Sequence, residues 1–245
     1  MKFSFARGAL ALMATLTLAS CGGGKATFPI NVSVTGVSYD GLVLTTNGQE
    51  LPIHYTGNPK TPATINAVFP NGIEYGEIYT VVPKTVTTTG SDGKAVTTVS
   101  YPQHQTCSPA SGYPIGLPIT GTAGQLSKIQ INYVCSINAY PLTGKVTGLR
   151  GTGLSLANGS GVTPVSISPA LGTDNQPTGA DITSLTLFSV TYDTTYGVTI
   201  LSQPTGQTCT VSGGANGTGA GTMDQAAETA GGVSNFVISC VNNPT

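Results

Sequence analysis

Apolar and polar side chains alternate along many short segments of this chain, and almost no segment has the spacing of a helix. In "VSNFVISC", residues 233–240, the side chains of Phe236, Ile238 and Cys240 fall on one face of an extended strand. The segment "KIQINYVC", residues 128–135, alternates in the same way. Alternation of this kind predicts strands with one buried and one solvent-facing side.

The second half of the chain contains about seven such runs, separated by Gly, Pro, Asn or Asp. They cover roughly 144–149, 153–158, 163–169, 182–189, 196–202, 207–212 and 233–241. Short strands at this spacing predict an all-β fold made of antiparallel β-sandwiches. The segment 222–232 shows the one helical cue, and we expect no more than a single helical turn there, within a loop.

The chain contains two copies of one unit of about 100 residues. "VSVTGVSYDGLVLTTNG" at 32–48 and "GKVTGLRGTGLSLANG" at 144–159 share Val-Thr-Gly, Gly-Leu-x-Leu and Asn-Gly. "YPQHQTC" at 101–107 matches "QPTGQTC" at 203–209, and the two cysteine-ended strands described above close the copies in the same order. We therefore expect two tandem domains.

These two domains are expected at residues 30–138 and 139–245. The first copy is longer, and the extra length lies between Val82 and Tyr101. There, two runs of Thr and Val flank a Ser-Asp-Gly turn, which predicts a β-hairpin inserted at residues 85–100.

Four of the five cysteines belong to the repeats. Four cysteines allow three pairings, and the repeat selects Cys107 with Cys135 and Cys209 with Cys240. Export would place these residues in an oxidising compartment, where disulfides form. A zinc site and redox catalysis are the alternatives, but both use closely spaced cysteine pairs, and no C-x-x-C occurs here.

The fifth cysteine lies at the end of a segment that has the pattern of a secretory signal, residues 1–20. Basic residues start it, and an apolar run of eleven residues at 8–18 is too short for a membrane span of about 20. The "LASC" motif that ends at Cys21 resembles the bacterial lipobox, whose cysteine thiol receives a diacylglycerol and becomes the first residue after cleavage. The alternative is an ordinary signal peptide with a cysteine nearby.

A lipid anchor on Cys21 implies attachment to a membrane, since two or more acyl chains hold a protein stably. Residues 21–29 would then form the lipidated cysteine and a flexible tether, with three glycines directly after Cys21. In lipoprotein sorting an Asp after the cysteine favours the inner membrane, and the chain has Gly22 there. The resemblance therefore implies the outer membrane, on either its cell-surface or its periplasmic face.

The pattern "VTGL…GTGLSLANG…QPTGQTCTVSGG…VISC" also resembles the tandem immunoglobulin-like repeats of proteobacterial outer-membrane surface lipoproteins. The resemblance covers nearly all of residues 30–242 and is more faithful in the second copy. It implies two immunoglobulin-like β-sandwich domains and a location, and it implies no activity. The hairpin insertion and "YPQH" in the first copy depart from the pattern.

The small number of charged side chains limits the classes of molecule that this chain could bind. Charged side chains make up 8% of the chain, against about a quarter in ordinary proteins. Without Lys2 and Arg7, seven basic side chains remain against ten acidic ones, a net charge near −3. No basic patch is present in the sequence, so nucleic acid and acidic surfaces are poor candidates.

Few residues suggest catalysis or metal binding. His54 alternates with apolar neighbours and is expected to face solvent, and His104 occupies a position where the second copy has Gly206, which indicates a turn. Asp174, Asn175 and Asp181 could supply oxygen ligands to calcium, but they form no regular calcium loop, so a solvated loop is preferred. Glycine-rich segments lack the lysine and following helix of a phosphate loop.

We therefore expect a non-enzymatic module, without cofactor or metal, that contacts another protein or a surface assembly. The alternative is a binder of a small ligand or glycan, with a site at the domain junction or in loops. One hypothesis makes the inserted hairpin the contact element, because exposed strand edges can pair with another strand. The alternative, which the pattern slightly favours, is a long solvated hairpin without a partner. Its candidate binding residues are Thr87, Thr89, Asp92 and Thr97.

Overall fold

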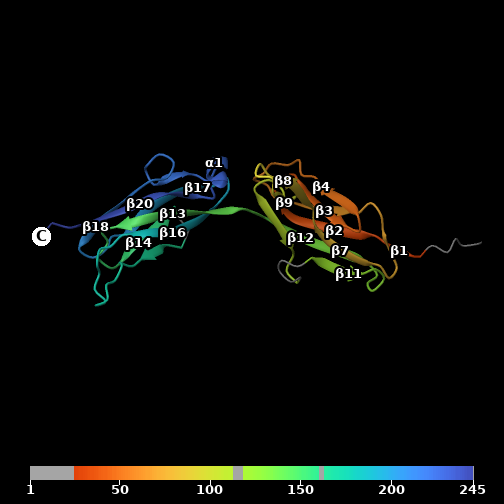
Figure 1. The fold of residues 1–245 in the computed structure, drawn as a ribbon, viewed down its shortest axis with the longest axis horizontal. Coiled ribbons are helices and arrows are strands. Elements are labelled where there is room, and N and C mark those ends of the chain that lie inside the picture. Colours follow the sequence, from red (N-terminus) through yellow and green to blue (C-terminus); the bar gives the residue numbers. More distant parts are fainter. Residues whose placement is uncertain (1–24, 113–117, 160–162, 245) are drawn as a thin grey trace, which may run out of the picture.

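The computed structural model describes residues 25–112, 118–159 and 163–244, and it shows two β-sandwich domains placed end to end (Figure 1). The expected signal segment and Cys21 lie outside the described residues. None of the helices in the described ranges has the length and hydropathy that a membrane span requires.

The first domain contains two four-stranded sheets, with the orders β10–β12–β2–β5 and β11–β7–β3–β4. The first sheet consists of β2 (Ile30–Val37), β5 (Ala63–Val68), β10 (Gln105–Pro109) and β12 (Ile129–Ile137). The second consists of β3 (Leu42–Thr46), β4 (Gln49–Ile53), β7 (Ile78–Pro83) and β11 (Ile119–Thr122). Two small pairs are added, β1 (Thr27–Phe28) with β6 (Ile73–Glu74), and β8 (Thr85–Thr89) with β9 (Ala95–Val99).

The second domain repeats this arrangement, with sheet orders β16–β13–β20–β18 and β15–β14–β17–β19. The first sheet consists of β13 (Ala139–Thr147), β16 (Ile182–Thr191), β18 (Gln207–Ser212) and β20 (Val233–Asn242). The second consists of β14 (Leu154–Asn158), β15 (Val165–Ile167), β17 (Thr195–Ser202) and β19 (Ala220–Thr222). One short helix, α1 (Gln225–Thr229), lies where the helical turn was expected.

The all-β sandwich fold class is confirmed, with one detail that the alternation did not reveal. In each domain the first and last long strands pair in parallel, β2 with β12 and β13 with β20. All other pairings between named strands are antiparallel. Each of the seven expected segments of the second copy overlaps a strand, although β13 already begins at Ala139, before the expected start at 144. β19 is an additional strand in a glycine-rich segment.

Each domain has its own hydrophobic core between its two sheets. The first core contains alternate residues of facing strands, such as Val32 and Ile131 from one sheet and Leu44 and Val81 from the other. Tyr133 crosses this core and donates a hydrogen bond from its hydroxyl to the Val81 carbonyl at 3.1 Å. Burial raises the pKa of Tyr133 to about 12, so its hydroxyl remains a neutral donor.

The structure contains both disulfides that the repeat indicates, Cys107–Cys135 and Cys209–Cys240. Each joins directly opposed residues of two neighbouring antiparallel strands, β10 with β12 and β18 with β20. The four cysteines are at most 8% exposed, and they face the core as the strand alternation requires. In both domains the bridge therefore lies within one sheet and fastens a strand of that sheet's edge to the closing strand of the domain.

Candidate interaction sites

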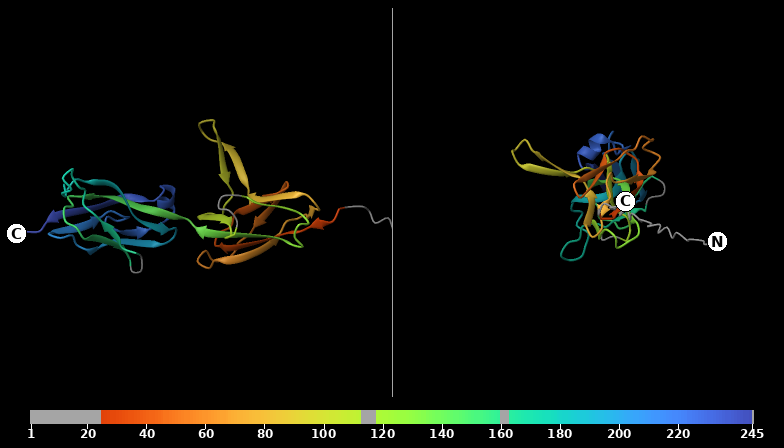
Figure 2. Two further views of the ribbon diagram at one scale, coloured as in Figure 1. Left: turned by 90° about the horizontal axis from the view of Figure 1, so that it is seen from below. Right: turned by 90° about the vertical axis from the view of Figure 1, so that its right-hand side faces the viewer.

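The hairpin of β8 and β9 projects sideways from the first domain, and it is the yellow ribbon in Figure 2. All ten residues of the two strands are exposed. Three valines are among them, with exposures of 38% for Val86, 45% for Val96 and 42% for Val99. The hairpin therefore presents both of its faces and some apolar surface outside the sandwich.

The hydrogen bonds at the two ends of the hairpin define which backbone groups point outward. Ser100 N–H donates to the Lys84 carbonyl, and Gly90 N–H donates to the Lys94 carbonyl, both at 2.7 Å. Hydrogen-bonded pairs alternate along an antiparallel ladder, so Val86 and Thr88 also bond within the hairpin. The backbone groups at Thr85, Thr87 and Thr89 on β8, and at Ala95, Thr97 and Val99 on β9, consequently point away from the partner strand.

The four candidate binding residues all lie on this hairpin, and they have two different roles. Thr87 and Thr97 are directly opposed, and their hydroxyl oxygens lie 2.9 Å apart. Thr89 lies at the end of β8 with its side chain exposed. The Asp92 carboxylate accepts a hydrogen bond from Lys94 N–H at 3.1 Å, which stabilises the turn. The structure thus gives Asp92 a local turn contact, while the three threonines line the exposed strands.

The base of the hairpin is attached to the sandwich. Lys84 N–H donates to the Val43 carbonyl on β3 at 2.7 Å. The Lys84 ammonium also lies 2.8 Å from the Glu50 carboxylate on β4. These contacts set the direction in which the hairpin leaves the domain.

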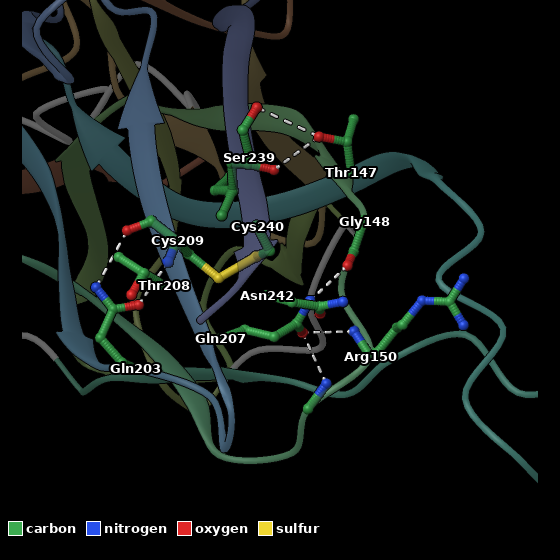
Figure 3. The surroundings of a disulfide bond; sticks show 12 residues. Thr147, Gly148, Arg150, Gln203, Gln207, Thr208, Cys209, Ser239, Cys240 and Asn242 are labelled. Carbon is green, nitrogen blue, oxygen red and sulfur yellow. Dashed lines mark hydrogen bonds between the residues drawn. A yellow bond between two sulfur atoms is a disulfide. The ribbon is translucent and has the colours of Figure 1, made fainter. Parts of the chain in front are cut away.

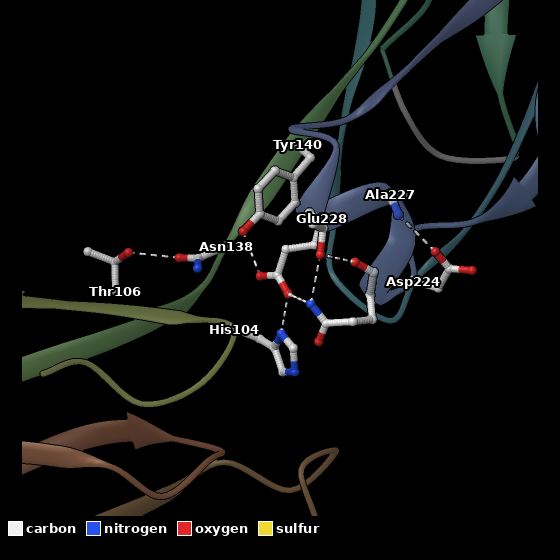
Figure 4. Close-up of polar contacts among 9 residues, drawn as sticks. His104, Thr106, Asn138, Tyr140, Asp224, Ala227 and Glu228 are labelled. Atoms are coloured by element: carbon white, nitrogen blue, oxygen red, sulfur yellow. Dashed lines mark hydrogen bonds and ion pairs between the residues drawn. The ribbon is translucent and has the colours of Figure 1, made fainter. Parts of the chain in front are cut away.

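A second group of polar and aromatic side chains lies where the two domains meet (Figure 4). His104 precedes β10 in the first domain, and its Nδ1 contacts the carboxylate of Glu228 on α1 of the second. The other Glu228 oxygen accepts a hydrogen bond from the Tyr140 hydroxyl at 2.6 Å. The His104 side chain is 5% exposed and that of Glu228 is 14% exposed, so water competes little with this contact.

Aromatic stacking strengthens the same junction. The rings of His104 and Tyr192 are parallel within 5° with centroids 3.6 Å apart, and Tyr39 meets both rings edge-on. Burial raises the pKa of Tyr140, and its hydrogen bond to Glu228 raises it further, so the phenol remains protonated and can donate. At the rim, Lys60 and Asp193 form an ion pair across the junction at 3.7 Å.

Two of the junction residues, His104 and Tyr39, differ from their counterparts in the second copy. His104 has φ of 60°, and Gly206, its counterpart in the second copy, has φ of 72°. The turn expected at His104 is therefore present, but sequence reasoning missed the contact that its side chain makes. Tyr39 corresponds to Gly151 in the aligned motifs. A left-handed position that is glycine in one copy and histidine in the other was the available signal, because a non-glycine residue there is unfavourable without a compensating contact.

Sequence reasoning also missed a buried glutamine in the "QTC" motif that both copies share. Gln207 is 4% exposed, and its Oε1 accepts hydrogen bonds from the backbone N–H groups of Arg150 and Gly151 at 2.7 and 2.8 Å (Figure 3). Its Nε2 donates to the Gly148 carbonyl at 2.9 Å. Gln105 makes the corresponding contacts in the first domain, with Ser38, Tyr39 and Gly36. The glutamine holds the loop after the first long strand against the sheet beside the disulfide.

The remaining candidates are placed as follows. His54 faces solvent as expected, but it lies one residue beyond the end of β4 and not within a strand, 3.6 Å from the Asp40 carboxylate. Asp174 accepts a hydrogen bond from Gln176 N–H at 3.1 Å and so belongs to a turn, next to Asn175 with φ of 57°. Within the described residues, no three His, Cys, Asp or Glu side chains are grouped so that they could hold a metal ion.

Replacing His104 by glycine should uncouple the two domains without unfolding the first. Glycine adopts the left-handed conformation of this turn without strain, so the stability of the first domain should change by less than about 1 kcal/mol. The contact with Glu228 and the stack on Tyr192 would be lost. Nitrogen-15 relaxation should then show two domains that tumble more independently, with a smaller effective correlation time for each.

Two further variants make this result specific. Glu228→Gln removes the charge of the acceptor on the other side of the same contact and should uncouple the domains in the same direction. His54→Ala removes an exposed histidine that pairs with Asp40 of the same domain, and it should leave the coupling unchanged. Identical relaxation in the wild-type chain and in His104→Gly would show that the contact does not hold the domains together.

Comparison with known proteins adds little to these observations. No protein-family model matches the chain, and no curated protein matches it. Among solved structures, the major pilin protein (T3.2) from Streptococcus pyogenes aligns over 91% of this chain and 100% of that chain, with 14% identity and a TM-score of 0.26. A TM-score this low does not establish a shared topology.

Proposed function

We propose that this chain is a non-enzymatic interaction module, anchored by a lipid to the bacterial outer membrane, that presents its inserted hairpin to an extended segment of a partner protein. One observation carries the proposal. The ten strand residues of the hairpin are all exposed, and both outer edges have backbone groups that point away from the hairpin. An added strand could pair with either edge, which is a common mode of peptide recognition.

The composition of the hairpin supports this type of occupant. Its two strands contain only Thr, Val and Ala, without a charge or a proline that would hinder pairing. β-branched residues suit an extended partner strand on a flat sheet edge. Lys94 and Asp92 lie in the turn, where they form an ion pair with each other at 3.7 Å.

The arrangement of the domains supports a display role. The domains follow one another along the long axis of the molecule, and the hairpin leaves the side of the first domain (Figures 1 and 2). The junction contacts of His104, Glu228 and Tyr192 would hold this extended shape. A lipid on Cys21 followed by a glycine tether would attach the end of the first domain to the membrane.

Proline scanning of the hairpin edges tests the contact. Thr87→Pro and Thr97→Pro each remove one outward N–H without removing a backbone hydrogen bond of the hairpin. Each also loses the hydroxyl contact between Thr87 and Thr97, and the alanine controls below lose it in the same way. If a partner strand pairs with an edge, the proline on that edge should lower the affinity for the partner by about tenfold, because one backbone hydrogen bond is lost and the proline ring blocks the approach of the partner strand. Crosslinking from a photoreactive residue at position 89, in native membranes, measures the contact.

The matched controls are Thr87→Ala and Thr97→Ala, which keep the backbone N–H and should retain the partner. Replacing residues 85–100 by a short Gly-Ser link should abolish the crosslinked product and leave both disulfides and both cores intact. Full retention of the same partner by both proline variants and by the deletion would place the contact elsewhere on the molecule.

The anchor is tested at a single residue. Cys21→Ser should abolish acylation, because serine lacks the thiol that receives the diacylglycerol, and the chain should accumulate as precursor or be released from the membrane. Mass spectrometry of the processed N-terminus and membrane fractionation measure both effects. Normal membrane retention of the variant, with an unchanged acyl mass, would contradict the lipoprotein assignment.

A further inference from the structure

Three exposed apolar side chains gather at the end of the first domain where the described chain begins. Tyr75 is 60% exposed, Ile78 is 68% exposed and Leu126 is 64% exposed. Tyr75 lies in the turn between β6 and β7, Ile78 is the first residue of β7, and Leu126 lies in the loop after β11. We call these three side chains the apolar tip. Large apolar side chains that occur singly are normal on a surface, whereas a group of them at one place indicates a contact.

Backbone hydrogen bonds hold the two segments of the apolar tip side by side. Gly76 N–H donates to the Ala123 carbonyl at 2.9 Å, and Ala123 N–H donates to the Glu77 carbonyl at 2.8 Å. The Tyr75 ring lies over Gly124, so closely that a side chain at position 124 would collide with it. The turn and the loop therefore form one structural unit.

The apolar tip directly adjoins the start of the described chain. Tyr75 N–H donates to the Ala26 carbonyl at 2.8 Å, and β1 pairs with β6 just before the turn. The Lys25 ammonium lies 3.7 Å from the Glu74 carboxylate. In Figure 1 this end of the first domain, labelled β1, lies opposite to the second domain.

The length of chain between Cys21 and the first domain limits how far the apolar tip can lie from a lipid anchor. Three glycines, residues 22–24, separate Cys21 from Lys25. A chain spans at most about 3.6 Å per residue, so Lys25 lies within about 15 Å of Cys21. A short tether also makes the contact intramolecular, with an effective concentration in the millimolar range, so that a weak contact is populated.

The chemistry of the apolar tip suits the headgroup region of a bilayer. Tyrosine combines a ring with a hydroxyl and is enriched at membrane–water interfaces, and the two aliphatic side chains can enter the acyl boundary. The charges nearby balance, with Lys25 and Lys128 against Glu74 and Glu77. Apolar burial, and not attraction to anionic lipid, would therefore stabilise such a contact.

We propose that the apolar tip inserts into the headgroup region of a lipid bilayer, so that the first domain stands on the membrane and the second domain points away from it. The inference rests on the proposed lipid anchor at Cys21, which brings the bilayer within reach. It is separate from the partner contact of the hairpin, because β8 and β9 leave the side of the first domain (Figure 2).

The test couples the mature chain, residues 21–245, chemically to lipid. The other four cysteines are in disulfides, so only the Cys21 thiol reacts with a maleimide-headgroup lipid in phosphatidylcholine nanodiscs. A gadolinium-chelating lipid in the same nanodiscs raises the relaxation rates of nearby methyl groups. We expect strong enhancement at Ile73, a buried neighbour of the apolar tip, and little at Leu201 of the second domain.

The coupling separates this inference from the proposed anchor. Because the lipid is attached chemically, the result does not depend on whether the cell acylates Cys21, which Cys21→Ser tests. A failed acylation test with a positive nanodisc result would overturn the anchor alone.

A double variant shows whether the apolar tip makes the contact. Ile78→Thr combined with Leu126→Gln changes two exposed positions, so the melting temperature should stay the same. The ratio of contacting to released chains should fall about tenfold, because two aliphatic side chains are lost from the contact, and the enhancement at Ile73 should fall with it. The matched control is Leu201→Gln, at a position that is 60% exposed in the second domain, and it should leave the enhancement at Ile73 unchanged.

Three results would overturn the proposal. If the double variant keeps the wild-type enhancement at Ile73, the tether alone accounts for it. Equal enhancement at Ile73 and at Leu201 would mean that the chain does not stand on its first domain. A response to the double variant that occurs only when two chains share a nanodisc would show that the apolar tip contacts a second copy in place of lipid.

Discussion

Replacing both Cys209 and Cys240 by alanine should lower the free energy of unfolding of the second domain by about 3–4 kcal/mol. The bridge joins two residues that are 31 positions apart in the sequence. In the chain-entropy model, a cross-link that closes a loop of this length lowers the entropy of the unfolded chain and so destabilises the unfolded state by about 3–4 kcal/mol. Both residues are buried beside the core, so the variant also loses some apolar contact.

Denaturant titrations followed by two-dimensional NMR measure this loss for each domain, since each has its own core and its own signals. The same double substitution at Cys107 and Cys135, which are separated by 28 residues, is the matched control. It should destabilise the first domain by a similar amount and leave the unfolding midpoint of the second domain unchanged. If the domain whose disulfide is removed loses less than about 1 kcal/mol of its free energy of unfolding, the disulfide contributes little to its stability.

Gln207→Ala should destabilise the second domain by about 3 kcal/mol. The substitution removes one side chain that accepts two backbone hydrogen bonds and donates to the Gly148 carbonyl. The N–H groups of Arg150 and Gly151 then lose their acceptor, the side chain of Gln207, which is 4% exposed. An unsatisfied buried donor costs about 1–3 kcal/mol, and two are created here.

The matched control is a second glutamine from the same part of the domain. The Gln203 side chain makes two hydrogen bonds, to the backbone N–H and carbonyl of Cys209 at 2.7 and 3.1 Å, but it is exposed (Figure 3). Water can replace these bonds, so Gln203→Ala should cost about 0.5–1 kcal/mol. Equal losses for the two variants, measured by urea denaturation, would show that burial of Gln207 does not raise the cost.

The strand alternation predicted the buried faces of this protein well. Phe236, Ile238 and Cys240 are all at most 8% exposed, as the pattern of the last strand requires. In β4, Ile53 is buried, and His54, which directly follows it, is exposed. These assignments need only the two-residue period of a strand, because each sandwich buries one face of each sheet.

Other features could not be read in this way. β19 (Ala220–Thr222) lies in a glycine-rich segment, and it becomes a strand because β17 offers it a partner edge. The parallel pairing of the first and last strands is likewise a property of the closed sandwich. Local propensity does not encode either feature, since both depend on a distant strand.

The sequence by itself determined the repeat, the strand faces, the position of the hairpin and the cysteine partners, because each of these follows from local alternation or from comparison of two copies within one chain. Only the tertiary structure brought His104 to Glu228, which is 124 residues away. This contact depends on how two folded domains meet, and no period or spacing along the chain records that.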